Sequence, residues 1–107
     1  MKRGEIRWYK FQHPDKKRPV VLLTRNSIMG YLGEITVAPI TSTIRDIPSE
    51  VFLSKEDGMK NDCVINLDHI QTVSKGRIGS FISKLTDSKM KKLKTAVNFA
   101  LGFDEIA

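Results

Sequence analysis

The chain has 107 residues, of which 40% are hydrophobic and 28% charged, so we expect one folded domain over residues 1–107 and exclude a disordered chain. No apolar run approaches the roughly 18 residues of a membrane span, no secretory signal is visible, and the single cysteine excludes an internal disulfide framework. These features predict a cytoplasmic protein, and the net charge of +6 favours nucleic acid or an acidic protein as its partner.

The first half of the chain reads as a series of short strands. Aromatic and charged residues alternate over residues 5–11, which predicts a strand, and Pro14-Asp15 marks a turn. The continuous apolar run over residues 19–24 predicts a strand that is buried on both faces. Residues 26–33 contain two glycines and read as a loop, and residues 34–40 predict a third strand.

The second half adds more strands and then changes period. Residues 41–48 are polar and irregular, whereas residues 49–53, 63–67, 69–73 and 81–85 predict strands, with a bulge or bend at Asp68. From Met90 to Leu101 apolar residues recur at steps of three and four, which predicts a helix that Thr86 or Asp87 caps and Gly102 ends. The expected class is therefore mainly β with a C-terminal helix, built as a small barrel or strongly bent sheet.

Metal and covalent chemistry find little support in the sequence. His13, Cys63 and His69 are the soft metal ligands, and no two of them have the spacing of a zinc site. Cys63 lies in an apolar strand, where a thiolate is disfavoured, so we expect it in the core. We find no glycine-rich phosphate loop and no nucleophile elbow. The sequence therefore predicts neither a metal nor a cofactor.

The carboxylates also fail to suggest an acid–base pair. Glu34, Glu50, Asp57 and Asp62 all stand in turn-like surroundings. We expect each of these four side chains to be solvated at the surface.

Two segments could hold an anion. Arg18 stands before Pro19, whose ring keeps the preceding residue extended, and a guanidinium group presents a planar fork of donors that suits phosphate. Thr41, Ser42 and Thr43 follow another strand and offer hydroxyl groups and backbone amides. The plain alternatives are a surface charge for the arginine and a simple turn for the hydroxyl residues.

Four blocks of the sequence resemble the MazF/PemK family of toxin endoribonucleases. They are KRGEIRWYKF at residues 2–11, RPVVLLT at 18–24, VAPITS at 37–42 and NDCVINLDHIQTVSKGRI at 61–78, and their order and distances match the family over nearly the whole chain. The resemblance implies an SH3-like barrel of bent antiparallel strands, similar to that of CcdB, and a homodimer. It also implies metal-independent cutting of single-stranded RNA at short sequences, and a cognate acidic antitoxin that blocks the site.

The resemblance also implies site residues. The family's catalytic arginine falls on Arg18 and its catalytic threonine on Thr41, with Ser42 beside it; an acid found in some members falls on Asp68, and His13 stands near a histidine that others carry. The first loop is shorter here than in many relatives. In addition, Asn66 and Gln71 stand where relatives have arginine.

A mechanism follows as a hypothesis. The 2′-hydroxyl of the RNA attacks the adjacent phosphorus, and Arg18 stabilises the negative charge that develops. Thr41 holds the phosphate or orients the hydroxyl. His13 or Asp68 is the candidate base. We expect four cations to follow the RNA backbone. These cations are Lys16, Lys17, Arg45 and Lys55. Trp8 or Phe11 could stack on a base, but the core is the expected place for each.

Two alternatives remain open at this stage. One is a non-enzymatic toxin of the CcdB type, and the other is an SH3-like binding module that does not cut RNA. The lysines of the predicted helix, at positions 89, 91, 92 and 94, are either solvated or a landing site for an acidic antitoxin segment.

Overall fold

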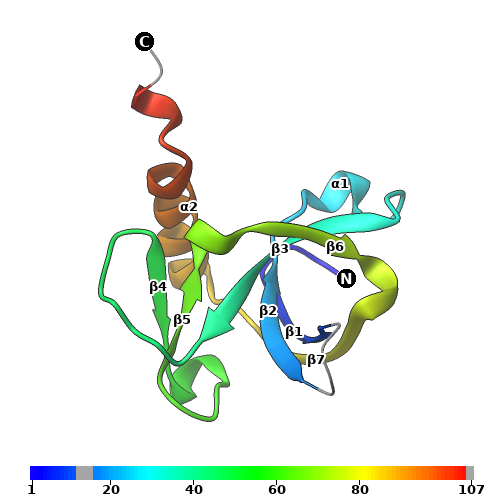
Figure 1. The fold of residues 1–107 in the computed structure, drawn as a ribbon, viewed down its shortest axis with the longest axis horizontal. Helices are drawn as coiled ribbons and strands as arrows, with labels where there is room; N and C mark the ends of the chain where they lie inside the picture. Colours follow the sequence, from blue (N-terminus) through cyan, green and yellow to red (C-terminus); the bar gives the residue numbers. More distant parts are fainter. Residues whose placement is uncertain (12–15, 106–107) are drawn as a thin grey trace.

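The computed structural model describes residues 1–11 and 16–105, which form a strongly curled antiparallel sheet with a helix packed against one end (Figure 1). The predicted mainly β fold with a bent sheet and a C-terminal helix is confirmed. The strands are β1 (Glu5–Lys10), β2 (Lys17–Leu22), β3 (Glu34–Thr41), β4 (Glu50–Leu53), β5 (Cys63–Asn66), β6 (Gln71–Ser74) and β7 (Ile78–Lys84), and the helices are α1 (Asn26–Met29) and α2 (Asp87–Leu101).

Strand β3 is the centre of the sheet. The strand order is β4-β5-β3-β2-β1-β7, and β6 pairs with β3 as well. The first half of β3 pairs with β6, whereas Ile40 and Thr41 at its end pair with β5. Because β5 and β6 lie along the same edge of β3, the chain bends between them in a 3₁₀ turn, Leu67–His69. The bend expected at Asp68 is confirmed.

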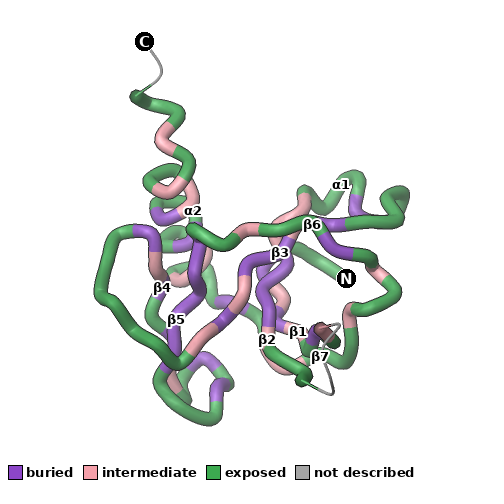
Figure 2. Tube along the Cα trace, viewed as in Figure 1, coloured by how far each residue is buried: buried purple, intermediate pink, exposed green. Residues whose placement is uncertain are grey.

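The two faces of the sheet cover two separate hydrophobic clusters. The first contains Ile6, Val21 and Ile40 and packs under Leu93 of α2. The second contains Tyr9, Val20, Leu22, Ile35 and Val37. Successive residues of β2 therefore enter different clusters, and Val20, Val21 and Leu22 are all buried, as predicted for this strand. Figure 2 shows the buried stretch of β2 in purple.

The long helix begins and ends where the sequence predicts. The side chain of Thr86 accepts a hydrogen bond from the backbone N–H of Lys89, and Gly102 closes the helix in the left-handed region at φ 61°. Lys89 does not point into solvent, because its Nζ donates to the carbonyl oxygen of Phe52 at 2.5 Å and lies 3.6 Å from Asp57. Within the lysine row of the helix, Lys89 therefore serves to dock the helix on the sheet.

Four expectations about the strands, loops and carboxylates were wrong. Residues 26–33 contain α1, whose Met29 is buried in the second cluster. The last strand begins at Ile78, ahead of the predicted residue 81. Asp57 is buried and accepts a hydrogen bond from the backbone N–H of Ser54, and Glu50 accepts hydrogen bonds from two backbone N–H groups of the β3–β4 loop. Both carboxylates thus hold local backbone, as caps do.

Among residues 1–11 and 16–105, neither α-helix combines the length and the apolar character that crossing a membrane requires.

Candidate active site

Strand pairing brings Arg18 and Thr41 together. Strand β2 pairs with β3 in antiparallel register, with Val20 opposite Pro39. Continuing this register by two residues puts Arg18, at the start of β2, opposite Thr41, at the end of β3. Residues directly opposite each other in an antiparallel pair have Cβ atoms about 5 Å apart. Two residues that are 23 positions apart in the sequence thus become neighbours.

The alternation of side chains explains why both point to the same side. Arg18 lies two residues before Val20, and Thr41 lies two residues after Pro39, so both side chains are on the face that covers the second cluster. That cluster ends at Val20 and Val37. Arg18 and Thr41 therefore continue a buried face beyond the point where the hydrophobic core stops.

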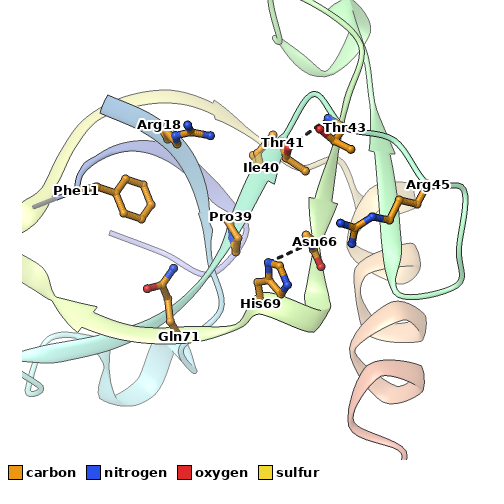
Figure 3. Close-up of a pocket in the computed structure, with 10 residues that line it drawn as sticks. All are labelled: Phe11, Arg18, Pro39, Ile40, Thr41, Thr43, Arg45, Asn66, His69 and Gln71. Carbon is orange, nitrogen blue, oxygen red and sulfur yellow. Dashed lines mark hydrogen bonds between the residues drawn. The ribbon is translucent and has the colours of Figure 1, made fainter. Parts of the chain in front are cut away.

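A cavity of about 360 Å³ opens at this point, and we call it the basic cavity. Figure 3 shows the ten residues that line it. They come from the position after β1, the start of β2, the end of β3 and the loop after it, and the segment from the end of β5 to the start of β6. Its polar side chains are those of Arg18, Thr41, Thr43, Arg45, Asn66, His69 and Gln71. None of the described residues that line the cavity carries a carboxylate, so this part of the cavity is suited to an anion.

The Thr41 hydroxyl group is oriented by its own turn. Its Oγ1 accepts a hydrogen bond from the backbone N–H of Thr43 at 3.2 Å. This contact uses a lone pair and leaves the hydroxyl proton available for donation. Thr41 is therefore prepared to donate a hydrogen bond to an anion in the basic cavity.

Asn66 and His69 form a second oriented pair. The Oδ1 atom of Asn66 accepts a hydrogen bond from the backbone N–H of Asp68 at 3.0 Å, which fixes the orientation of the amide. The Nδ2 atom of Asn66 then lies 3.4 Å from Nδ1 of His69. An amide nitrogen can only donate, so Nδ1 must accept, and a neutral His69 carries its proton on Nε2. The imidazole thus keeps an N–H donor for the cavity.

The loop after β3 brings Arg45 to the same cavity. A single oxygen of Glu50 accepts hydrogen bonds from the backbone N–H groups of Arg45 and Asp46, at 3.0 and 2.9 Å. Asp46 is also in the left-handed region, at φ 56°. The carboxylate of Glu50 therefore holds a tight turn that carries the Arg45 side chain to the cavity (Figure 3).

A second cavity of about 360 Å³ lies beside the first, and we call it the tryptophan cavity. Arg18, Ile40 and Thr41 line both cavities, so Arg18 and Thr41 stand on the ridge between them. Ser42 lines only the tryptophan cavity, as expected from its position one residue further along the strand. Trp8 is 38% exposed there, so the expectation that it lies in the core was wrong.

The structure separates the remaining predicted residues. Lys16 and Lys17 are exposed at the start of β2, close in sequence to Arg18, whereas Lys55 lies in a 3₁₀ turn and lines neither cavity. The Asp68 carboxylate accepts a hydrogen bond from the Ser49 hydroxyl at 2.5 Å and does not line either cavity. The bend between β5 and β6 turns His69 into the basic cavity and Asp68 away from it. His13 lies outside the described residues.

Sequence reasoning missed His69 and Asn66 as partners. His69 was considered only as a metal ligand, and Asn66 only as a departure from the family pattern. The available signal was the spacing of an asparagine and a histidine three residues apart across a predicted bend, where an asparagine side chain often bonds to nearby groups.

Cys63 is buried, as predicted. Burial raises the pKa of its thiol, and the negative charges of Asp62 and Asp57 raise that pKa further. The thiol form is therefore favoured, and Cys63 is poorly suited to be a nucleophile. Over the part of the chain that the structure describes, no three His, Cys, Asp or Glu side chains gather as metal ligands would.

Fold and site together define a small, curled β protein with a basic cavity where β2 begins and β3 ends. Residues 2–101 match the family of PemK-like, MazF-like toxins of type II toxin–antitoxin systems, and the chain belongs to this family. The resemblance found in the sequence is thereby confirmed.

Curated relatives and solved structures agree with this assignment. The chain is 36% identical to endoribonuclease MazF3 of Mycobacterium tuberculosis over 90 residues, which is 84% of this chain and 87% of the relative. It is 34% identical to endoribonuclease MazF of Staphylococcus saprophyticus over 92 residues, which is 83% of this chain and 77% of the relative.

Among solved structures, the Mycobacterium tuberculosis toxin MazF-mt6 superposes with a TM-score of 0.84 at 33% identity, over 92% of this chain and 96% of that one. A mycobacterial endoribonuclease in complex with its cognate antitoxin gives a TM-score of 0.86 at 24% identity, over 96% of each chain. The second comparison, at its lower identity, supports the fold alone.

Proposed function

We propose that this chain is the toxin of a type II toxin–antitoxin pair and acts as an endoribonuclease that cuts single-stranded RNA at short sequences without a metal ion. The observation that carries the proposal is the convergence of Arg18 and Thr41 on one basic cavity, in a chain 36% identical to a curated endoribonuclease. A non-enzymatic toxin of the CcdB type would have no need of this arrangement.

The chemistry uses a nucleophile that belongs to the substrate. The 2′-hydroxyl of the ribose gives up its proton to solvent water, and its oxygen forms a bond to the adjacent phosphorus. The bond from phosphorus to the 5′-oxygen then breaks as that oxygen takes up a proton from solvent water. The products are a 2′,3′-cyclic phosphate and a 5′-hydroxyl end. DNA lacks the attacking group, so the reaction is restricted to RNA.

Arg18 stabilises the charge that develops on the phosphate oxygens. A guanidinium group donates to two oxygens at once and stays protonated at any physiological pH. Fixed charge of this kind is usually the largest contribution to catalysis. Pro19 and the pairing of β2 with β1 and β3 keep Arg18 on a rigid strand, so little reorganisation is needed when RNA binds.

Thr41 and His69 complete the phosphate site. Thr41 donates from its free hydroxyl proton, because its lone pair already accepts from Thr43. His69 donates from Nε2, because Nδ1 already accepts from Asn66. Both donated hydrogen atoms are ones that the contacts with Thr43 and Asn66 leave available. Arg45, Lys16 and Lys17 supply further charge for the RNA backbone.

The partners follow from charge and from the relatives. The net charge of +6 suits an acidic antitoxin, and the family that the chain matches consists of toxins of type II toxin–antitoxin systems. We propose that Lys91, Lys92 and Lys94, exposed on α2, contribute to that contact. We also propose that the chain folds as a single domain, forms a homodimer and works in the cytoplasm.

The test is incubation of the purified chain with a long single-stranded RNA in EDTA, followed by mapping of the new ends. We expect cuts at a short recurring sequence and 5′-hydroxyl ends. Thr41→Val removes the hydroxyl at nearly constant shape, and Thr41→Ser restores it, so cutting should fall in the first variant and return in the second. Intact RNA, or cutting only after a divalent metal is added, would contradict the proposal.

A further inference from the structure

The tryptophan cavity has no role in the phosphate chemistry described above. Its walls are largely apolar and include Pro19, Ile40, Met59 and Ile82, and Trp8 stands among them. Its polar groups include the side chains of Asn61 and Asp62. Tryptophan normally buries much of its large ring, with its N–H bonded to a partner. A ring exposed to 38% at the mouth of a cavity is available to a ligand.

The position of the cavity follows from the sheet. Trp8 lies two residues after Ile6, on the face that covers the first cluster, and Pro19 is its partner on β2. The tryptophan cavity is thus the open end of the first cluster, as the basic cavity is the open end of the second. Both open at the end of the sheet where β2 begins and β3 ends. The ridge of Arg18 and Thr41 separates them.

The backbone at Trp8 is held in place by a neighbouring strand. A Cβ atom added at Gly79 of β7 would lie 3.2 Å from the carbonyl oxygen of Trp8 and 3.4 Å from its Cβ. The absence of a side chain at Gly79 therefore lets β7 pack closely on β1 at this point. The indole consequently starts from a fixed position on the cavity wall.

We propose that the tryptophan cavity binds one nucleobase of the RNA, next to the phosphate that Arg18 and Thr41 hold, and so contributes to sequence choice. This inference rests on the proposed function and deepens it. A base is flat and apolar on its faces, which suits stacking on Trp8. Its edge carries donors and acceptors that suit Asn61 and Asp62.

The apolar walls favour a base over a second phosphate. The tryptophan cavity is lined by the cations Arg18 and Lys60 and by the carboxylate of Asp62, so its charges largely balance, whereas its mainly apolar walls suit the faces of a base. The Asp62 carboxylate accepts hydrogen bonds from the amino group of a base. The basic cavity offers Arg18 and Arg45, and none of its described lining residues carries a carboxylate. One nucleotide can therefore straddle the ridge, with its phosphate on the basic side and its base on the tryptophan side.

Trp8 is the only tryptophan of the chain, so its fluorescence reports directly on this cavity. The probe is a short RNA of the mapped cut sequence, or of random sequence if no cut is found, made uncleavable by 2′-O-methyl groups. We expect the RNA to quench the fluorescence, and a version lacking one base beside the scissile phosphate to quench much less. Equal quenching by every abasic version, or no quenching by an RNA that binds, would overturn the proposal.

Cut-site profiles provide the second readout. Trp8→Ala should still cut RNA, but with binding weakened roughly tenfold and with base preference reduced at one position beside the cut. Trp8→Phe keeps a stacking face and should retain that preference. Asp62→Asn replaces an acceptor with a group that also donates, and should change which base is preferred there. Tyr31→Ala is the matched control, because Tyr31 is 88% exposed and lines neither cavity.

The two proposals fail in different ways. If the wild-type chain cuts no RNA but the abasic series still locates one quenching base, the endoribonuclease proposal falls and the base site stands. If the wild-type chain cuts RNA and Trp8→Ala, folded by circular dichroism, keeps the wild-type cut profile, the base site falls and the endoribonuclease stands.

Discussion

The side-chain amide of Asn66 donates to Nδ1 of His69 across 3.4 Å, at the long end of hydrogen-bond geometry. The amide cannot turn over without losing the bond that its oxygen accepts from the backbone N–H of Asp68. A single backbone group at a bend of the chain therefore decides which nitrogen of His69 carries the proton, and hence what the imidazole offers to the basic cavity.

This relationship predicts the tautomer of His69. In ¹⁵N NMR spectra of the neutral imidazole form, Nε2 of His69 should carry the proton and Nδ1 should not. Spectra of a His13→Gln variant assign the signals of the two histidines. Asn66→Asp keeps an acceptor for the Asp68 N–H but replaces the amide donor with an acceptor, so it should put a proton on Nδ1. An Nδ1–H tautomer in the wild-type protein would contradict the arrangement described for this pair.

Replacing Arg18 should abolish most of the activity. Losing one group that stabilises a developing oxyanion costs about 10²- to 10³-fold in kcat, and we expect a loss of this size in Arg18→Ala. Arg18→Lys should recover only part, because an ammonium group lacks the planar fork. Single-turnover cutting of a mapped RNA site gives both numbers.

The matched control for Arg18 is Arg25→Ala. Arg25 is exposed beyond the other end of β2 and lines neither cavity. Arg25→Ala removes the same charge as Arg18→Ala, so a general weakening of electrostatic attraction to RNA would appear in both variants. Wild-type rates in Arg18→Ala, or equal losses in both variants, would contradict the role assigned to Arg18.

Lys89 should contribute to stability in a way that its neighbours on α2 do not. Its ammonium group lies 3.6 Å from the buried Asp57 carboxylate and donates to the Phe52 carbonyl. Lys89→Ala leaves that carboxylate without its cation, and we expect a loss of about 1–2 kcal/mol in the free energy of unfolding.

Urea unfolding measures this effect, with Lys92→Ala as the control. Lys92 is exposed on the same helix, and a substitution at such a position usually changes stability by less than about 0.5 kcal/mol. Equal effects of the two variants would show that the contact between Lys89 and Asp57 adds nothing.

Cys63 should react slowly with alkylating reagents. Burial and the charges of Asp62 and Asp57 raise the pKa of the thiol, and the thiolate is the reactive form. At mildly alkaline pH, iodoacetamide should modify the native chain more than roughly tenfold slower than the chain unfolded in urea. Fast alkylation of the native chain would mean that Cys63 is more exposed and more acidic than the structure describes.

The sequence was a good guide wherever local rules decide the structure. The caps of α2 at Thr86 and Gly102 depend only on neighbouring residues. The continuous apolar run of β2 indicates by itself a strand that is buried on both faces, and its residues Val20, Val21 and Leu22 are buried. The short helix α1 was missed because glycines at 30 and 33 suggest a loop, while burial of Met29 against a distant cluster stabilises the helix.

The site was less predictable because it depends on contacts between distant segments. Arg18 and Thr41 could be selected by their chemistry, but only the register of β2 on β3 makes them neighbours. His69 enters the basic cavity, and Asp68 leaves it, through a bend forced by two strands that share one edge of β3. Trp8 has the alternation of a core residue and remains exposed because the first cluster ends there.

The most direct test of the central claim is a single change in the substrate. A short RNA with one mapped cut site is compared with the same RNA carrying a 2′-deoxy nucleotide on the 5′ side of the scissile phosphate, in EDTA. We predict that both bind with similar affinity and that only the all-ribose RNA is cut, leaving a 2′,3′-cyclic phosphate. Cutting of the deoxy-substituted RNA at the same bond would contradict the account, because the nucleophile would then have to come from water or from the protein.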